Sequence, residues 1–192
     1  MRVGVVDYTV GNIGSVINAL KRAGAEPLVI KNPEETSSVD VLVLPGVGTY
    51  EVAYKMAHAF RDSILQKPTL AICLGMQLLF ESSEEGGGRG LAIFRGSVKR
   101  IEARKIPHIG WSYTKVVRPQ PFVESGYYYY MHSYGVLWDE NDESHVAYVE
   151  LGRRYVAAVL YKGILGLQFH PERSGRGGIE LIRRFLKEMA RR

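Results

Sequence analysis

The single cysteine of the chain stands where a catalytic nucleophile could work. Cys73 follows the apolar run Leu70–Ile72 and precedes residues with a helical pattern. This predicts a strand-to-helix junction, and the small residues Ala71 and Gly75 would let the two elements cross closely around a strained turn. A thiol at the start of a helix ionises more readily, and the backbone N–H of Leu74 would point toward an oxyanion formed on the sulfur. Taken alone, however, a cysteine in an apolar strand is more often a small core residue.

A second motif could supply the base for such a nucleophile. Pro171 disfavours the α conformation at His170, so we predict an extended segment here. Residues i and i+2 of an extended chain project to the same side, so Glu172 could hold one ring nitrogen of His170 while the other faces a substrate. A His-Pro-Glu segment can also be only a surface turn. Together with Cys73, it would complete a Cys-His-Glu arrangement for nucleophilic catalysis.

A glycine loop could supply hydrogen-bond donors to the same reaction. The loop Pro45-Gly46-Val47-Gly48 follows the apolar run Val41–Leu44. Two glycines around Val47 would let a peptide turn its N–H toward developing negative charge without steric penalty. The loop is not typical of phosphate binding, because no Lys-Ser/Thr follows the glycines. A plain turn is the simpler interpretation of a Pro-Gly pair.

The elements that must position these motifs follow two patterns. In the first half, short apolar runs alternate with segments of helical pattern. The apolar runs are Val3–Val6, Pro27–Ile30, Val41–Leu44 and Leu70–Cys73, and one helical face after the first run consists of Ile13, Val16, Ile17 and Leu20. Alternating strands and helices predict a doubly wound α/β fold, with a mostly parallel central sheet and flanking helices. Residues 93–169 are rich in β-branched and aromatic residues, which favours antiparallel strands and hairpins.

These elements would form one domain over residues 1–192, closed by a helix from about Gly178. Alternate rings of the run Tyr127–Tyr130 would fall on the two faces of one strand. The three motifs all come after predicted strands. In an open α/β sheet, chemistry belongs at the carboxyl ends of the strands, which is where we expect the motifs to meet.

The overall balance is basic, with 25 Lys+Arg against 20 Asp+Glu. This balance invites a nucleic-acid interpretation, but Ile182, Phe185, Leu186 and Met189 keep the spacing of a buried helical stripe, so the tail charges are expected to form its solvated face. No apolar stretch approaches the roughly 20 residues of a membrane span, and the start of the chain does not read as a signal peptide. One cysteine allows no internal disulfide and fits a reducing cytoplasm.

With these motifs in this order, the sequence resembles the class I (triad) glutamine amidotransferases. Within them it is similar to the glutaminase subunits of imidazole glycerol phosphate synthases, from histidine biosynthesis. The strand-to-helix junction around Cys73, called the elbow below, and the segment Gln168–Ser174 are shared across the superfamily. The segments that select the subfamily are Pro45–Gly48, Pro107–Trp111 and Tyr129–Tyr134. Matching pieces near the start are Asp7-Tyr8 and Gly11-Asn12, so the resemblance covers essentially the whole chain.

The resemblance implies a role for each matching residue. Cys73 would attack the side-chain amide of L-glutamine to give a thioester and ammonia, while His170, oriented by Glu172, would move the protons. The positions that match the oxyanion loop and the glutamine-binding residues are Gly46, Val47, Gly48, Gln77, Ser133 and Tyr134. We expect no cofactor and no metal.

A partner is implied as well. In the family, ammonia passes to a (β/α)₈-barrel cyclase subunit, where a ribulosyl nucleotide is converted to imidazole glycerol phosphate and aminoimidazole carboxamide ribotide. This sequence departs from the usual pattern at Gly14, Tyr50, Ala71 and Ser112. His108, Trp111 and His132 could be structural or interfacial.

Three other functions stay open on the sequence alone. The chain could be the glutaminase subunit of another synthase, such as that of pyridoxal phosphate synthesis, or a cysteine hydrolase of γ-glutamyl compounds that needs no partner. It could also be a non-enzymatic nucleic-acid or assembly module that binds through its charge of +5. The subfamily segments argue against the first, and the intact Cys73, His170 and Glu172 set argues against the last.

Overall fold

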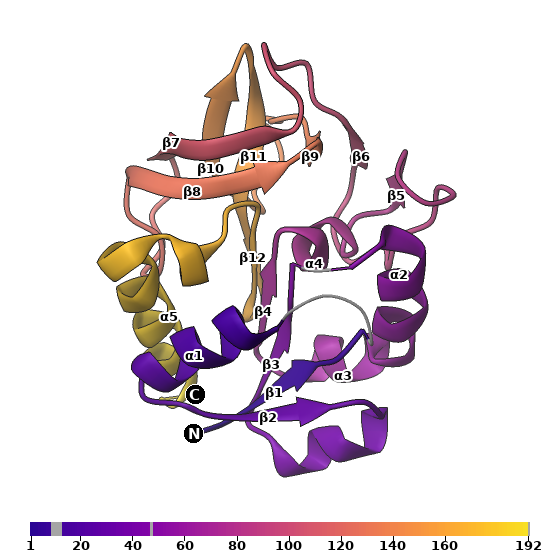
Figure 1. Ribbon diagram of the computed structural model, residues 1–192, viewed down its shortest axis with the longest axis vertical. Helices are drawn as coiled ribbons and strands as arrows, with labels where there is room; N and C mark the ends of the chain where they lie inside the picture. The colour runs from indigo at the N-terminus through magenta and orange to yellow at the C-terminus, as the bar shows by residue number, and fades with distance from the viewer. Residues whose placement is uncertain (9–12, 47, 192) are drawn as a thin grey trace.

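The computed structural model describes residues 1–8, 13–46 and 48–191, and its centre is one large sheet (Figure 1). Within the described residues, this sheet has nine strands in the order β2-β1-β3-β4-β12-β11-β10-β7-β8. The parallel strands are β1 (Arg2–Val6), β2 (Glu26–Ile30), β3 (Val41–Leu44), β4 (Thr69–Ile72) and β12 (Ile164–Leu167). The strands that continue antiparallel are β11 (Arg153–Tyr161), β10 (His145–Leu151), β7 (His108–Val116) and β8 (Gly126–His132).

The remaining elements are short or lie on the faces of the sheet. A small second sheet contains β5 (Ser82–Ser83), β6 (Ser97–Arg100) and β9 (Tyr134–Val136). The helices are α1 (Gly14–Arg22), α2 (Tyr50–Ala59), α3 (Arg61–Gln66), α4 (Leu74–Gln77) and α5 (Gly175–Met189), and a 3₁₀ helix spans Pro33–Ser38. Among the described residues, none of these helices is long and apolar enough to cross a membrane.

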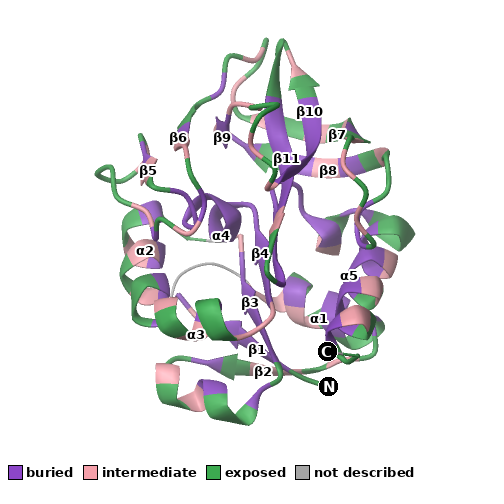
Figure 2. Cartoon of the chain, turned by 180° about the vertical axis from the view of Figure 1, so that it is seen from behind, coloured by how far each residue is buried: buried purple, intermediate pink, exposed green. Residues whose placement is uncertain are grey.

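Helices cover both faces of the parallel part of the sheet. Alternate residues of β3 show why: Val41 and Val43 pack in the cluster beneath α1 and α5, whereas Leu42 and Leu44 pack in the cluster beneath α2 and α3. The central strands β1, β3 and β4 are mostly buried, whereas β2 and β7 at the two sides of the sheet are mostly half-buried or exposed (Figure 2). The helices are buried mainly on the side that faces the sheet (Figure 2). The predicted fold class is confirmed: the strands of the first half, β1 to β4, pair parallel in this sheet. Its second-half strands pair antiparallel with one another, as expected, except that β12 also pairs parallel with β4.

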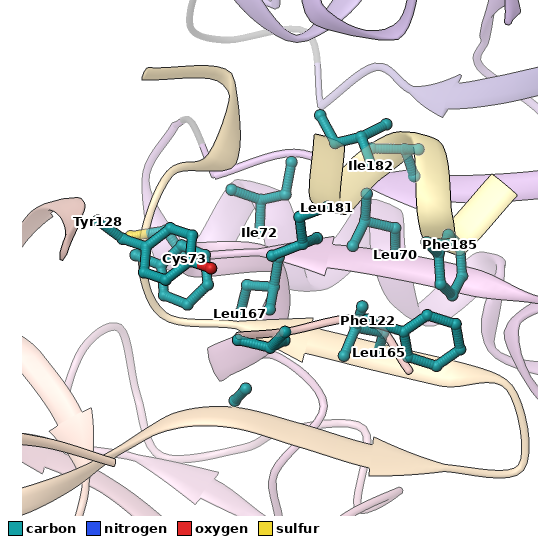
Figure 3. Close-up of a cluster of buried hydrophobic side chains, with 14 of the residues drawn as sticks. Leu70, Ile72, Cys73, Phe122, Tyr128, Leu165, Leu167, Leu181, Ile182 and Phe185 are labelled. Carbon is teal, nitrogen blue, oxygen red and sulfur yellow. The ribbon is translucent and has the colours of Figure 1, made fainter. Parts of the chain in front are cut away.

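The last helix, α5, docks its apolar stripe on β4 and β12. Leu181, Ile182 and Phe185 lie over the strand residues Leu70 and Leu165 (Figure 3). All four residues of the predicted stripe are buried, so the basic residues between them lie outward, as expected. The helix begins at Gly175, three residues before the predicted start at about Gly178.

The sheet order brings the three predicted motifs to one edge. Strand β4 lies between β3 and β12, with Ala71 opposite Leu44 and Ile72 opposite Leu167. The three strands end at the same level of the sheet. The glycine loop comes directly after β3, Cys73 directly after β4, and the segment containing His170 directly after β12. Three segments far apart in the sequence are therefore neighbours at the carboxyl ends of adjacent parallel strands.

Candidate active site

Cys73 occupies a strained turn between β4 and α4. Its backbone has φ 47° and ψ −105°, in a region that L-residues rarely adopt. The peptide is held in place because the Cys73 N–H donates to the Leu167 carbonyl at 2.6 Å. A Cβ on Gly75 would lie 2.3 Å from the Leu44 carbonyl oxygen, so only glycine fits at this crossing. Ala71, in contrast, is accommodated inside the core with no exposed surface.

His170 and Glu172 form a buried pair. The Nδ1 atom of His170 lies 2.7 Å from Oε1 of Glu172, and the two side chains are only 3% and 4% exposed. The His170 N–H donates to the Tyr129 carbonyl, and the Ser174 hydroxyl donates to the His170 carbonyl, so the backbone of the histidine is held from both sides. The ring therefore has little freedom to turn away from its carboxylate.

The predicted extended conformation of this segment is only partly correct. His170 is extended, with φ −97° and ψ 97°, as expected before a proline. Residues Pro171–Arg173 instead form a 3₁₀ turn, because a proline suits the first position of a helical turn. Glu172 reaches the imidazole through this turn and not along an extended strand.

The electrostatics of the pair favour a protonated ring. Burial by itself disfavours the charged imidazole, but the interactions with Cys73 and Glu172 outweigh it and raise the pKa of His170 to about 10. The Nε2 atom is buried and makes no hydrogen bond of normal geometry to any described residue. A protonated His170 beside the sulfur would favour a thiolate and could then donate its Nε2 proton to a leaving group.

The glycine loop and the elbow lie in contact. A Cβ on Gly46 would lie 2.8 Å from Cβ of Cys73 and 3.1 Å from Cε1 of His170. Leu74 is the first residue of α4, so its N–H has no acceptor within the helix and is available for an oxyanion. Gly48 turns the chain with φ 104°. Val47, also predicted for this loop, lies outside the described residues.

A pocket of about 220 Å³ opens in front of the sulfur. The predicted site residues that line it are Gly46, Gly48, Cys73, Leu74, Gln77, Ser133 and Tyr134. Four more residues also line it, and they received no functional role from the sequence: Glu85, Pro107, Met131 and His132. No spacing signal could have found Glu85, because it lies in a polar turn that only the fold brings to the pocket.

The two histidines left undecided by the sequence are cross-strand neighbours on β7 and β8. His132 is paired with His108, and their rings meet edge to face at 5.8 Å. Burial lowers the pKa of His132 to about 4, so at neutral pH the ring is uncharged and places no second cation beside His170. His132 donates from Nδ1 to the Tyr134 carbonyl at 2.8 Å, and Nε2 of His108 lies 2.9 Å from the Ser112 hydroxyl.

The described part of the chain holds no cluster of three or more His, Cys, Asp or Glu side chains placed to bind a metal ion. The site combines a cysteine on a strained turn, an imidazole held by a carboxylate, and backbone donors beside a small pocket. Such a set can form and hydrolyse an acyl-enzyme thioester.

Comparison with known proteins gives close relatives over nearly the whole chain. The model of the family "Glutamine amidotransferase class-I" matches residues 4–189. The imidazole glycerol phosphate synthase subunit HisH of Pyrobaculum aerophilum is 66% identical over 186 residues, with 97% of each chain covered. HisH of Methanopyrus kandleri is 39% identical, with 95% of this chain and 96% of the relative covered.

Solved structures with low sequence identity share the fold. The structure of PurLQS from Thermotoga maritima matches with a TM-score of 0.77 at 20% identity, covering 98% of both chains. The glutaminase domain of Trypanosoma brucei CTPS matches with a TM-score of 0.73 at 16% identity, covering 100% of this chain and 94% of that one. The family match and the HisH relatives confirm the resemblance seen in the motifs over nearly the whole chain. The chain belongs to the class-I glutamine amidotransferase family, within the group of HisH subunits.

Proposed function

We propose that this chain hydrolyses L-glutamine to glutamate and ammonia and delivers the ammonia to a partner synthase subunit. The observation that carries the proposal is the meeting of Cys73, the His170–Glu172 pair and Gly46, of which Cys73 and Gly46 line the pocket. The identity of 66% to a HisH subunit supports the same reaction. The free thiol of Cys73 suits a reducing compartment, so we place the chain in the cytoplasm.

The pocket suits a free amino acid in size and charge. Its volume of about 220 Å³ matches a small polar molecule. Burial raises the pKa of Glu85, which lines the pocket. An ammonium group bound beside this carboxyl group would lower its pKa and so favour the ionised carboxylate. We assign the α-ammonium of glutamine to Glu85, and the rest of its amino-acid end to Ser133 and Tyr134. The side-chain amide then points toward Cys73.

The reaction would proceed in two halves. The Cys73 thiolate attacks the amide carbon, and the oxyanion is held by the N–H of Leu74 and by the glycine loop around Val47. The imidazolium of His170 donates its proton to the amide nitrogen, the C–N bond breaks, and ammonia leaves a thioester behind. Neutral His170 then takes a proton from water as the water attacks the thioester, and glutamate is released with the thiolate restored.

An exposed aromatic surface beside the pocket fits a docking site for the partner. This surface, the β7–β8 face, consists of the exposed residues Ile109, Trp111, Tyr113, Tyr127 and Met131 and the half-buried Tyr129. Trp111 is 54% and Tyr127 is 66% exposed, which is unusual for rings that belong to one contiguous sheet face. Aromatic residues and methionine are enriched at protein interfaces. Met131 also lines the pocket, so the face reaches the place where ammonia is released.

We propose that this partner is the (β/α)₈-barrel cyclase subunit of imidazole glycerol phosphate synthase. The names of the HisH relatives describe a subunit of that synthase. The chemistry favours a docked partner too, because free ammonia is mostly protonated at neutral pH and then no longer nucleophilic. A docked subunit can take up the neutral molecule before water protonates it. We therefore expect glutamine hydrolysis to be slow in the isolated chain and faster in the complex.

Substitution of the nucleophile tests the proposal. In the complex, Cys73→Ala should abolish glutamine-dependent synthesis of imidazole glycerol phosphate, while synthesis from added ammonium salts continues at the wild-type rate. Product formation is followed with each nitrogen source in turn. Equal loss with both sources would mean that Cys73 supports the structure and not the chemistry. Rapid hydrolysis by the isolated chain, unchanged by the cyclase, would favour a stand-alone γ-glutamyl hydrolase.

A further inference from the structure

A buried glutamine next to the nucleophile has no task in the reaction described above. Gln168 follows β12 directly and has no exposed surface. Its side-chain Nε2 lies 3.5 Å from Sγ of Cys73, within hydrogen-bond distance for sulfur. Among the described residues, the sulfur therefore interacts with His170, the Met131 carbonyl and the Gln168 amide.

The orientation of the Gln168 amide is set by its neighbours. Gln77 places its amide 2.8 Å from the Tyr134 carbonyl, and a carbonyl can only accept, so the Gln77 atom there is the nitrogen. The same nitrogen lies 3.1 Å from the amide of Gln168, which must therefore present its oxygen. This leaves the Gln168 nitrogen facing Cys73. A backbone carbonyl thus determines, through two glutamine side chains, that an N–H points at the sulfur.

The contacts of the sulfur favour different protonation states. A neutral thiol can donate to the Met131 carbonyl, which lies 3.7 Å away. A thiolate has no proton to donate there, but it can accept from Gln168, and a hydrogen bond to an ionised acceptor is stronger than one between neutral groups. The Gln168 N–H therefore stabilises the ionised sulfur selectively.

We propose that Gln168 is a positioning residue, whose amide holds the sulfur of Cys73 toward the pocket and stabilises its thiolate form. Through Gln77 and Tyr134, the same amide is tied to residues that line the pocket. The use of the thiolate in glutamine hydrolysis rests on the proposed function. The contact between Gln168 and the sulfur does not, so the two ideas can fail separately.

Alkylation of the thiol tests the contact directly, because Cys73 is the only cysteine in the chain. The rate of reaction with iodoacetamide, measured against pH, reports the ionisation of this one sulfur. In Gln168→Met, which keeps the length of the side chain, the pH of half-maximal rate should rise by about one unit, so at pH values below the midpoint the rate should fall about tenfold. A wild-type profile in the folded variant would overturn the proposal.

Gln120→Met is the matched control. It makes the same chemical change in a half-buried glutamine whose amide bonds Phe122 and Val123 of its own loop. We expect its alkylation profile to match the wild type. If Gln120→Met shifts the profile as far as Gln168→Met, the shift reflects general loosening of the fold, and the proposal is wrong.

A second variant covers the case in which Gln168→Met fails to fold. Gln168→Glu keeps the size and the oxygen for Gln77, but it replaces the donor with a carboxylate oxygen, so the upward shift should exceed that of Gln168→Met. In the complex, either folded variant should lower kcat for glutamine about tenfold and change KM less than about twofold. A raised KM with unchanged kcat would contradict a role at the sulfur. A shifted alkylation profile in a chain that proves to have no glutaminase activity would still support the contact.

Discussion

At the residue scale, the His170–Glu172 pair links the protonation of the base to the stability of the fold. The pKa of His170 rises from 6.5 to about 10 on folding, since its interactions with Cys73 and Glu172 outweigh burial. A raised pKa means that the folded chain holds the proton more tightly than the unfolded chain. The resulting stabilisation is fully present below about pH 6.5 and is lost as the pH rises toward 10.

Replacement of the carboxylate gives a prediction with a definite sign. Glu172→Gln should lower the pKa of His170, because it removes the negative charge 2.7 Å from Nδ1. The free energy of unfolding of the variant should fall below that of the wild type most at pH 6.5, and the gap should narrow toward pH 10. NMR titration of the ring and denaturant unfolding across this range check both points. An unchanged ring pKa would show that Glu172 does not control the base.

At the element scale, the turn that carries Glu172 depends on the first residues of α5. A Cβ on Gly178 would lie 1.9 Å from the carbonyl oxygen of Pro171, so the helix can approach the turn only with glycine there. A Cβ on Gly177 would meet nothing within 4 Å. These adjacent glycines therefore differ in what they do. Gly178 allows a close crossing that places Glu172, whereas Gly177 only adds flexibility to the helix.

The two glycines form a matched pair for substitution. Gly178→Ala should displace the turn Pro171–Arg173, lower the free energy of unfolding by about 1–3 kcal/mol, and reduce glutamine hydrolysis by as much as about 10²-fold. Gly177→Ala should leave hydrolysis unchanged and raise the stability by about 0.5–1 kcal/mol. Thermal unfolding and steady-state assays of the complex measure both. Similar behaviour of the two variants would show that the crossing does not position the carboxylate.

At the scale of the whole molecule, the antiparallel strands extend the sheet beyond the catalytic edge and present the β7–β8 face. The parallel strands have helices on both sides, but the outer side of β7 and β8 carries rings in contact with solvent. Trp111 and Tyr129 pack edge to face, as do Tyr113 and Tyr127. The rings thus support one another as a preformed surface, which lowers the entropy cost of binding a partner.

This surface predicts separate effects on binding and on stability. Trp111→Ala should weaken binding of the cyclase at least about tenfold, because exposed tryptophans at interfaces are frequent hot spots, while the melting temperature of the free chain changes little. Leu65→Ala in α3 is the control, since Leu65 is 50% exposed on an element far from this face (Figures 1 and 2). Titration calorimetry gives the affinities. Equal affinities for the two variants would exclude the β7–β8 face as the docking surface.

Much of the architecture could be read from the sequence, because it depends on near neighbours. The predicted strands of the first half match β1 to β4 within one residue at each end. The run Tyr127–Tyr130 alternates as expected, with Tyr128 and Tyr130 buried and Tyr127 exposed. The junction at Cys73 was recognisable because a strand pattern, a helix pattern and small flanking residues are all local properties.

Features that depend on residues far apart in the chain required the folded structure. From the sequence, Pro171 could begin a helical turn or continue a strand. In the structure it begins a 3₁₀ turn, and the Pro171 carbonyl packs closely against Gly178 of α5. Gln168 turns its N–H toward Cys73 because β4 and β12 are neighbours in the sheet. Glu85 lines the pocket because the fold brings the loop after β5 beside the site. Local sequence was enough to say which residue types stand at the ends of strands. The positions of side chains relative to one another were determined by long-range packing, which no local pattern encodes.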